Sequence, residues 1–377
     1  MIVCLSELRN TEFHMTKKKI GILTGGGDCP GLNAVIRGVA KTAINVHDME
    51  VVGFLDGFLG MLEGHWVDLT YEKVSGILTQ GGTILGTTNR DNPFACKVQE
   101  NGVERIVDLS DRCIATYKNL GLEALVCLGG DGTMGIAGEL AAKGVNVVGV
   151  PKTIDKDVVG TDITFGFDSA RELCTEAIDR LHTTAASHHR VMLVEVMGRN
   201  AGWLALESGI AGGGDVILIP EVPYSLDKIV EVVARRNKTG RKFSIVVVAE
   251  GAHPAGGSKT YQGHEASLRL GGVSHTIAAD IEKASGIECR VTVLGHLQRG
   301  GTPTAFDRLL ATQFAVKAVE LVVKGEFNRM VAMKAGQIDS VPIADILHMQ
   351  RKIPLDSPLI NIALAMGTSL GADIQAV

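Results

Sequence analysis

Short apolar runs, each followed by a glycine-rich loop and then by an amphipathic stretch, recur along this chain. Residues 19–24 are largely apolar, residues 25–31 read GGGDCPG, and apolar side chains then return at helical spacing from Val35 to Ile44. The same order recurs at residues 124–128, 129–132 and 134–143, and a further apolar run occupies residues 145–150. Continuous rather than alternating apolar strands between helices indicate a parallel sheet covered on both faces. The pattern therefore predicts a doubly wound α/β unit.

A second series of the same kind starts near Asp168. A helical stripe from Leu173 to Leu181 precedes apolar runs at residues 191–196, 216–219 and 243–249. No serine- or proline-rich linker separates the two series, so we expect a tight crossover near Thr164 with a cleft between two domains. We expect the first domain to span 15–166, completed by part of 298–350, and the second to span 167–297, with 351–377 packing back.

Composition narrows the class of protein. The 377 residues are 45% hydrophobic and 21% charged, which suits packed cores, but only 4% aromatic, which is too few for stacking surfaces on single-stranded nucleic acid. The formal net charge of −5 gives no general basic field for a nucleic-acid backbone or an anionic membrane. We therefore expect no nucleic-acid or membrane partner, and any anion site must be local.

Cysteine usage and the N-terminal segment bear on location. The seven cysteines form no C-x-x-C pair, so neither a disulfide framework nor a zinc site is indicated. No run of 18 apolar residues occurs, and residues 1–10 lack the features of a secretory signal, so we expect a cytoplasmic protein. Met15, followed by Thr16 and three lysines, resembles a natural start better than Met1, and we expect residues 1–14 to be disordered or a start-site artefact.

The 46 glycines cluster after apolar runs. A strand that ends in glycines and opens a helix brings backbone N–H groups to a ligand, and the helix N-terminus adds partial positive charge, so phosphate is the natural ligand. One such loop is equally well explained as a strand cap, but two at corresponding strand ends favour a phosphate site. No Walker A sequence is present, because GGSKT at residues 256–260 has the wrong spacing.

The second glycine loop carries an acid. Residues 130–135, GDGTMG, satisfy the G-x-G-x-x-G pattern and Asp155 lies about 20 residues further on, so an NAD-dependent oxidoreductase is one alternative. A carboxylate at Asp131 would repel phosphate unless a cation lay between them, which favours Mg²⁺ bridging phosphates, as in phosphoryl transfer. The simpler interpretation of Asp131 is a helix cap.

Two further acids follow the apolar run at residues 147–150. Strand-like alternation would point Asp155 and Asp157 to the same side. One can accept the proton of an attacking hydroxyl while the other orients it or holds metal, and Lys152 can neutralise charge on a transferred phosphoryl group. In isolation this segment is best interpreted as a solvated turn, but beside two glycine loops a catalytic segment is favoured.

Arginines adjoin strand ends in the second half, at Arg190, Arg199 and the segment from Arg290 to Arg299. The planar donors of arginine suit the phosphate of a sugar phosphate, and histidine or a carboxylate such as Glu250 suits its hydroxyls. A single arginine is more often a solvated surface charge. His188, His189 and His296 have no acid or cysteine at ligand spacing, so they indicate no metal site.

Together these motifs closely resemble the 6-phosphofructokinase family from Lys17 to about Gly371. The motifs are residues 25–31, GGDGT at 129–133, TIDKD at 153–157, VMGR at 196–199 and LGHLQR at 294–299. The resemblance implies an α/β fold of two Rossmann-like doubly wound domains with the active site in the cleft between them. It implies a first domain that binds ATP and a second that binds fructose 6-phosphate. It also implies phosphorylation at C1 to fructose 1,6-bisphosphate in glycolysis, a Mg²⁺ requirement and a homotetramer or dimer.

The resemblance assigns roles to individual residues. It makes Asp155 the base, with Asp157, Thr153 and Lys152 beside it and Arg199 stabilising the transition state. The implied donor cradle consists of Gly27, Arg90, Gly130, Gly132 and Thr133, with Asp131 at the Mg²⁺ position. The implied sugar-phosphate site consists of Thr153, Asp155, Met197, Gly198, Arg199, Glu250, His296 and Arg299, together with Arg190 and Arg290 reaching in from a neighbouring subunit.

The phosphoryl donor is the contested point. Within the family, glycine at Gly132 goes with ATP and aspartate there goes with pyrophosphate, whereas Lys152 is typical of pyrophosphate users and of a mixed-donor branch. This combination favours ATP, and a pyrophosphate-dependent fructose 6-phosphate 1-phosphotransferase is the alternative. The segment 86–93 that carries Arg90 is one residue longer than the family pattern. A kinase of NAD or lipid should lack the sugar motifs, and a non-catalytic regulatory subunit should lack the base or metal carboxylates.

Overall fold

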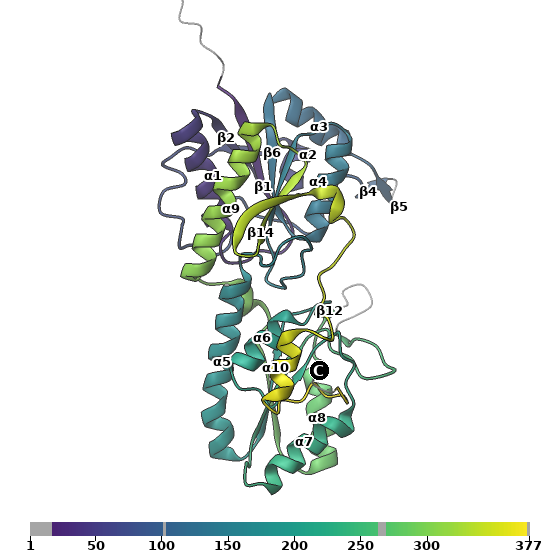
Figure 1. The fold of residues 1–377 in the computed structure, drawn as a ribbon. Helices are drawn as coiled ribbons and strands as arrows, with labels where there is room; N and C mark the ends of the chain where they lie inside the picture. The colour runs from purple at the N-terminus through teal and green to yellow at the C-terminus, as the bar shows by residue number, and fades with distance from the viewer. Residues whose placement is uncertain (1–16, 101–102, 263–268, 375–377) are drawn as a thin grey trace, which may run out of the picture.

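The buried apolar runs form two separate main sheets, one in each lobe of the molecule (Figure 1). The computed structural model describes residues 17–100, 103–262 and 269–374, so the expectation for residues 1–14 lies outside the described part. The parallel sheets predicted from the continuous apolar runs are present, and the α/β fold class is confirmed.

The first sheet has seven strands in the order β15-β14-β7-β6-β1-β2-β3. Its middle strands run parallel, and the two edge strands, β15 and β3, pair antiparallel to their neighbours. The strands are β1 (Lys19–Thr24), β2 (Glu50–Phe54), β3 (Trp66–Asp68), β6 (Leu122–Gly129), β7 (Val147–Pro151), β14 (Arg329–Lys334) and β15 (Gln337–Pro342).

Helices cover both faces of this sheet. One face packs against the pair α1 (Leu32–His47) and α9 (Ala305–Lys324), whose side chains share a core with the strands. The other face packs against α2 (Phe58–Glu63), α3 (Ser110–Asn119) and α4 (Asp131–Ala142). Since β1 leads to α1 on one face and its neighbour β6 leads to α4 on the other, the strand order reverses between β1 and β6. Ligands of doubly wound sheets bind at such a point.

The second sheet is wholly parallel, in the order β13-β8-β10-β9. Its strands are β8 (Val191–Val196), β9 (Val216–Leu218), β10 (Ser244–Ala249) and β13 (Cys289–Val293). The helices α5 (Phe167–His188) and α6 (Trp203–Ala211) cover one face, and α7 (Leu226–Lys238) and α8 (Val273–Ser285) cover the other. The short α10 (Pro358–Ala365) packs against α6.

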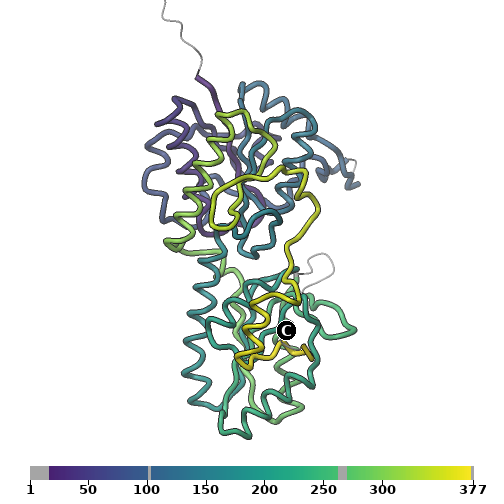
Figure 2. The backbone as a smooth tube through the Cα atoms, viewed as in Figure 1, coloured from purple at the N-terminus to yellow at the C-terminus, as the bar shows by residue number. Residues whose placement is uncertain are grey.

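The chain passes between the lobes three times (Figure 2). It crosses after β7 to reach α5, returns through the 3-10 helix η2 (Gly295–Arg299) to α9, and crosses again after η3 (Ile343–Asp345) to α10. One apolar core continues along these connections from α1 and α9 to α5 and α6. The strands at residues 329–342 thus lie in the first sheet and α10 lies on the second, while the domain limits given above stay a prediction.

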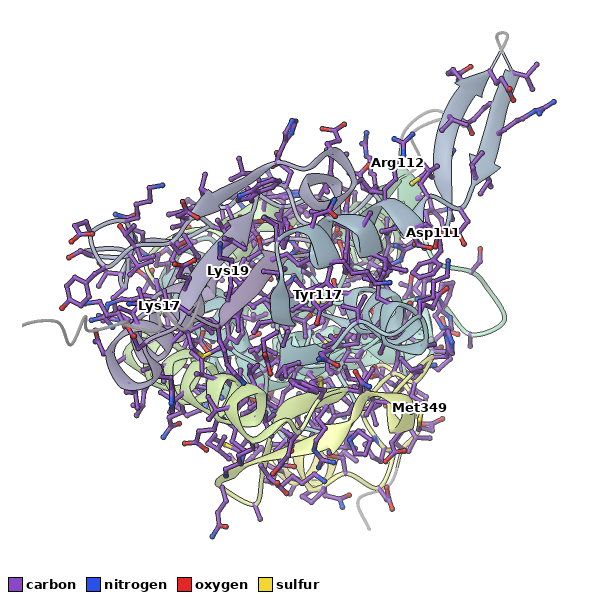
Figure 3. All side chains as sticks on the ribbon, turned by 90° about the horizontal axis from the view of Figure 1, so that it is seen from above. Lys17, Lys19, Asp111, Arg112, Tyr117 and Met349 are labelled. Carbon is purple, nitrogen blue, oxygen red and sulfur yellow. The ribbon has the colours of Figure 1, made fainter. Side chains whose placement is uncertain are left out.

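A two-stranded hairpin of β4 (Cys96–Glu100) and β5 (Val103–Val107) projects from the upper lobe, beyond Asp111 and Arg112 at the start of α3 (Figure 3). A second small pair joins β11 (Tyr261–Gln262) to β12 (Arg269–Leu270). Among the described residues no helix is long and apolar enough to span a bilayer, and the six cysteines described there are free thiols.

Candidate active site

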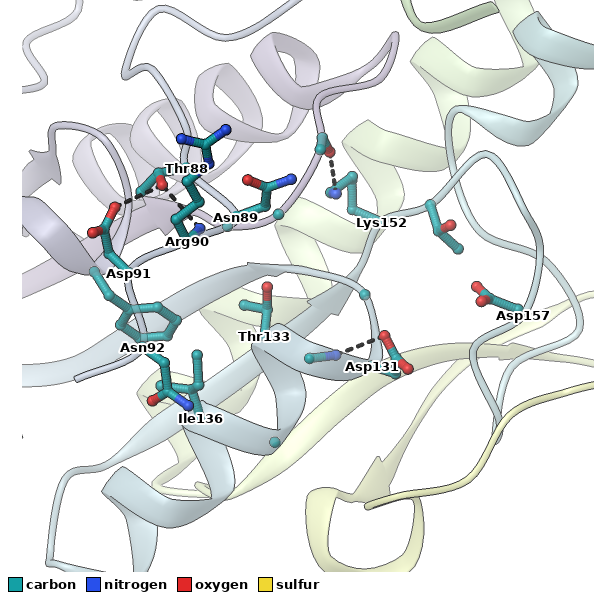
Figure 4. Close-up of a pocket in the computed structure, with 18 of the residues that line it drawn as sticks. Thr88, Asn89, Arg90, Asp91, Asn92, Asp131, Thr133, Ile136, Lys152 and Asp157 are labelled. Carbon is teal, nitrogen blue, oxygen red and sulfur yellow. Dashed lines mark hydrogen bonds between the residues drawn. The ribbon is translucent and has the colours of Figure 1, made fainter. Parts of the chain in front are cut away.

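A cavity of about 540 Å³ opens where the loops after β1, β6 and β7 meet (Figure 4). These loops lie at the carboxyl edge of the first sheet, beside the point where its strand order reverses. The cavity brings together many of the residues singled out from the sequence, namely Gly27, Arg90, Gly130, Asp131, Gly132, Thr133, Lys152, Thr153, Asp155, Asp157 and Arg299.

Thr133 is buried in the first turn of α4, and its side chain explains why glycine is needed at the two positions that pack against it. A Cβ at Gly129 would lie 2.2 Å from the Thr133 side chain, and one at Gly25 would lie 2.7 Å from it, so any side chain there would collide. Gly132 differs, because a Cβ there would meet nothing within 4 Å and would point into open space. Packing therefore does not require glycine at position 132, which lines the cavity and leaves room for a ligand.

Asp131 is the first residue of α4, which starts three residues earlier than the apolar pattern predicted. Its Oδ1 accepts a hydrogen bond from the Gly132 N–H at 2.7 Å, as an acid in the first turn of a helix often does. Its Oδ2 accepts from the Gln350 side chain at 3.1 Å. The carboxylate is exposed and lines the cavity. Asp131 therefore makes a hydrogen bond like that of a helix cap and can also contact a ligand in the cavity.

The loop after β7 carries two acids with unusual protonation behaviour. Thr153 Oγ1 accepts the Asp155 N–H at 3.0 Å, and Asp155 Oδ1 is buried without a hydrogen-bond partner among the described residues. Burial raises the pKa of Asp155 to about 6, against the opposing charge of Arg299. Burial, together with the negative charge of Asp155, raises the pKa of Asp157 to about 7. An unpartnered buried carboxylate oxygen facing a cavity is a candidate proton acceptor.

Two cations lie beneath the first glycine loop. The Lys152 side chain is 4% exposed, and its ammonium donates to the carbonyl oxygen of Gly27. Burial lowers the pKa of Lys152. Arg299 Nη1 donates to the carbonyl oxygen of Asp28 at 2.9 Å and lies against Gly27, where a Cβ would approach it to 2.3 Å. Both side chains line the cavity and place positive charge opposite the acids.

Three of the residues assigned to a sugar site, Met197, Gly198 and Glu250, lie at the carboxyl edge of the second sheet. Met197 and Gly198 follow β8, and Glu250 follows the neighbouring β10. The Glu250 N–H donates to Val196 at 2.8 Å, which joins the two strand ends. The charge of Glu250 contributes to the raised pKa of Asp155, so Glu250 stands near the acid loop. Arg199 and His296 are exposed and lie outside the lining of the cavity, as do Met197, Gly198 and Glu250.

Arg190 and Arg290 lie at the opposite edge of the second sheet. Arg190 precedes β8 and Arg290 is the second residue of β13, so both stand at the amino ends of their strands. Both pair with Glu288, with Arg190 Nε 2.6 Å from Glu288 Oε2. The structure therefore separates these two arginines from the cavity of their own chain.

Several residues of the site were given no role in the sequence analysis. Gln298 accepts the Met197 N–H at 3.1 Å and donates to Gly295 at 3.0 Å, so it connects η2 to the end of β8. His348 lines the cavity from a segment that follows η3, and no local motif marks it. The segment that carries Arg90 contributes further lining residues, Thr88, Asn89, Asp91 and Asn92, which only its unusual length could have suggested.

The carboxylates fit a divalent cation that is shared with a ligand. Asp131, Asp155 and Asp157 line one cavity, and the charges of Asp131 and Asp155 raise the pKa of Asp157, a repulsion that a cation would relieve. Within the described ranges no group of three or more His, Cys, Asp or Glu side chains is placed to hold a metal alone. Mg²⁺ commonly binds through one or two carboxylates, with substrate phosphates and water as its other ligands.

Comparison with known proteins agrees with this geometry. A phosphofructokinase family model matches residues 19–322. ATP-dependent 6-phosphofructokinase 2 of Clostridium perfringens is 51% identical over 358 residues, covering 93% of this chain and 98% of the relative. ATP-dependent 6-phosphofructokinase 3 of Bacteroides thetaiotaomicron is 48% identical over 353 residues, covering 94% and 100%. The crystal structure of Pichia pastoris phosphofructokinase in the T-state has a TM-score of 0.76 at 32% identity, covering 93% of this chain and 37% of the yeast chain. This chain belongs to the phosphofructokinase family.

Proposed function

We propose that this chain is an ATP-dependent 6-phosphofructokinase that converts fructose 6-phosphate to fructose 1,6-bisphosphate in cytoplasmic glycolysis. The observation that carries the proposal is the cavity in which two glycine loops face a buried carboxylate oxygen, Oδ1 of Asp155, with no hydrogen-bond partner in the described part of the chain. Its relatives at 51% and 48% identity are named as ATP-dependent enzymes of this kind. The phosphotransferase class is that of the family.

In this reaction Asp155 accepts the proton of the C1 hydroxyl as that oxygen attacks the γ-phosphorus of ATP, and the bond from that phosphorus to the bridging oxygen breaks, so that ADP leaves. With a pKa of about 6, Asp155 is mainly ionised at neutral pH yet basic enough to take the proton. The proton ends on Oδ1 of Asp155, to which no other group among the described residues donates a hydrogen bond. Lys152 and Arg299, together with Arg199, offset charge on the transferring group, and Thr153 holds the Asp155 backbone.

The donor occupies the cavity lined by Gly27, Arg90, Gly130, Gly132 and Thr133. Asp131 would hold Mg²⁺ there, since its carboxylate is exposed to the same space. When bound, Mg²⁺ neutralises phosphate charge and orients the donor. The amides at the start of α4 would bind the donor phosphates, and no side chain at Gly132 obstructs that approach.

Fructose 6-phosphate binds at the carboxyl edge of the second sheet, through Met197, Gly198, Arg199, Glu250, His296 and Arg299. Arg190 and Arg290, which the family resemblance assigns to the sugar-phosphate site, stand at the far edge of this sheet in their own chain. We therefore assign those two arginines to the site of a second copy of this chain. The working enzyme is then a homo-oligomer, a dimer or tetramer.

Pyrophosphate is the second candidate donor, and the buried Lys152 against the first glycine loop is the observation that favours it. A donor comparison tests the choice. Purified protein is assayed with fructose 6-phosphate and Mg²⁺, using ATP in one arm and pyrophosphate in the other. We expect ATP to support turnover at least tenfold better, and product formed with pyrophosphate but not ATP would overturn the proposal.

Gly132→Asp sharpens the comparison. A carboxylate at this open position would crowd and repel the α-phosphate of ATP, so we expect kcat/KM for ATP to fall roughly 10²-fold, about 2.7 kcal/mol. Gly132→Asn is the matched control of equal size without the charge, and it should lose less. Tm should not fall in either variant, because both replace glycine in the first turn of a helix. Unchanged ATP kinetics in Gly132→Asp would refute the steric and electrostatic argument.

A further inference from the structure

Lys156 separates the two acids of the loop but does not face the cavity. Its φ is +55°, a left-handed conformation that is strained for a residue with a side chain. Asp155 and Asp157 on either side both line the cavity, whereas Lys156 does not. Its ammonium instead donates to Glu207 Oε1 of α6 at 2.6 Å. The strained turn thus sends two carboxylates one way and one ammonium the other.

The Lys156–Glu207 pair is largely shielded from water. The two side chains are 14% and 11% exposed, so the pair is screened much less than a surface ion pair. The Lys156 ammonium also lies 4.8 Å from the centre of the Phe167 ring and 5.2 Å from that of Trp203. Contacts of this length between a cation and aromatic rings are attractive, so the ammonium is held by one charge and two rings.

Glu207 is held in place independently of Lys156. Arg171 Nη1 donates to Glu207 Oε2 at 2.9 Å, so each carboxylate oxygen has its own cation. Arg171 also pairs with Asp168, which accepts from the Thr304 hydroxyl at 2.7 Å. The acceptor of Lys156 is therefore part of a network that joins α6, α5 and the start of α9, three helices of the continuous core (Figure 1).

A second contact ties the same loop to the same helix. The carbonyl of Asp157 accepts the Arg351 N–H at 2.8 Å. The carbonyl of Arg351 in turn accepts from the Trp203 indole N–H at 3.0 Å, and the Arg351 guanidinium lies 4.7 Å from the Trp203 ring centre. The acid loop, which follows a strand of the first sheet, is thus connected to α6 through two contacts, one at Glu207 and one through Arg351 to Trp203, and α6 covers the second sheet.

We propose that Lys156 is a positioning residue, whose ion pair with Glu207 anchors the acid loop across the two lobes and aims Asp155 at the sugar hydroxyl. The inference rests on the proposed function, because it takes Asp155 as the proton acceptor. The donor loops belong to the first sheet and the sugar residues to the second. A link between acid and α6 therefore fixes the base relative to the hydroxyl that it must deprotonate.

The test compares Lys156→Met and Lys156→Arg with Arg171→Gln. Methionine keeps the length, the apolar stem and the backbone cost of the left-handed turn but removes the charge. We expect kcat to fall about 10- to 100-fold in Lys156→Met, with KM for both substrates within about threefold, since misplacing a base affects the chemical step more than binding. Lys156→Arg, which can still reach Glu207, should recover most of the activity.

Arg171→Gln is the matched control because it removes the other cation from the same Glu207 carboxylate and leaves the loop attached. It should lower Tm about as much as Lys156→Met while kcat changes less than threefold. Equal losses of kcat in the two variants would show that Lys156 acts only through general stability, and would overturn the proposal. So would a Lys156→Met variant with wild-type kcat.

The pH profile separates positioning from electrostatics. A positioning role lowers the plateau of kcat without moving the pH at which activity falls. Loss of a positive charge acting directly on Asp155 would raise its pKa and move that limb to higher pH, and this result would contradict the proposal. Asp155→Asn, assayed in parallel, distinguishes failure of the anchoring role from failure of the proposed function. If Asp155→Asn stays active, the proposed function is wrong. If Asp155→Asn is inactive while Lys156→Met keeps wild-type activity, only the anchoring role is wrong.

Discussion

Asp155 and Asp157 show how one short loop creates two different carboxyl groups. Burial raises the pKa of Asp155 to about 6, and Arg299 and Lys152 hold it from rising further. The pKa of Asp157 is raised to about 7 because the negative charges of Asp155 and Asp131 add to the effect of burial. Both carboxyl groups are therefore shifted toward the protonated form, and neighbouring negative charges add to the shift in Asp157. The buried Oδ1 of Asp155, which has no hydrogen-bond partner among the described residues, supports the proton-accepting role proposed for this acid.

The raised pKa of Asp155 gives a prediction with a definite sign. A base works only when deprotonated, so kcat/KM should be flat above about pH 7 and fall about tenfold per pH unit below about pH 6. Asp155→Asn should remove this limb and lower kcat by about 10²–10⁴-fold. The measurement is kcat/KM for fructose 6-phosphate from pH 5 to 9 at saturating ATP and Mg²⁺. An enzyme fully active at pH 5, or an Asp155→Asn variant within a few-fold of wild type, would contradict the assignment.

Among the structural elements, those marked by glycine after an apolar run could be predicted from the sequence. The strands β1 and β6 and the helix α1 form close to where the pattern places them, and α4 does so with a start three residues earlier. A buried parallel strand needs a continuous apolar run, and the turns after β1 and β6 need glycine near Thr133. Lys156 could not be interpreted in this way. Its partner, Glu207, lies 51 positions along the chain in another lobe, and no local pattern encodes that pairing.

The hairpin of β4 and β5 and the contact between Asp307 of α9 and Ser169 of α5 were also beyond local patterns. The hairpin strands are exposed, so no apolar stripe marks them. At the start of α9, Thr304 accepts from the Asp307 N–H, and Asp307 Oδ2 accepts from the N–H and the hydroxyl of Ser169 at 2.8 and 2.6 Å. Asp307 is fully buried, and its Oδ1 has no partner in the described part of the chain. The contact between Asp307 of α9 and Ser169 of α5 joins residues 138 positions apart, so it could not be predicted from a local sequence pattern.

The raised pKa of Asp307 leads to a prediction of how the stability of the protein depends on pH. Burial raises its pKa to about 6, above the value in an unfolded chain, so the folded state binds the proton more tightly. The corresponding stabilisation is present at pH 4 and is lost as the pH rises through about 6. Relative to Asp307→Asn, which stays neutral, wild type should lose roughly 3 kcal/mol of unfolding free energy between pH 4 and pH 8. Denaturant unfolding of both proteins across this range is the measurement.

Ser169→Ala is the companion variant for this junction. The Ser169 hydroxyl donates to the charged form of Asp307 and lowers its pKa, so removing that hydroxyl should extend the loss of stability to higher pH. A wild-type protein whose stability relative to Asp307→Asn is independent of pH would show that Asp307 is not buried as an ionisable group in solution.

At the scale of the whole molecule, the two lobes meet at their carboxyl edges while both arginines paired with Glu288 stand at the far edge of the second sheet. The three crossovers and the Lys156–Glu207 pair hold the lobes together within one chain. The arrangement completes the donor half of the site in each chain and leaves Arg190 and Arg290 turned away from it. A second copy related by a twofold axis would present its own pair to this site, and the reverse contact would be equivalent.

This arrangement predicts that two inactive variants restore each other. Asp155→Asn destroys the acid but leaves the arginine that it offers to its neighbour, whereas Arg290→Ala keeps the acid and loses the arginine. In a mixed pair one of the two sites has both groups intact, so random exchange of equal amounts should recover about a quarter of wild-type sites. Activity is measured after subunit exchange, at a fructose 6-phosphate concentration where each variant alone is inactive.

Arg299→Ala with Asp155→Asn is the matched control, because Arg299 and Asp155 line the same chain's cavity and every mixed site then lacks one of them. No recovery in the first mixture, once exchange is verified by native mass spectrometry, would contradict a shared site and place Arg290 in its own chain's site. Recovery in the control mixture would contradict the premise that Arg299 and Asp155 serve the same chain's site.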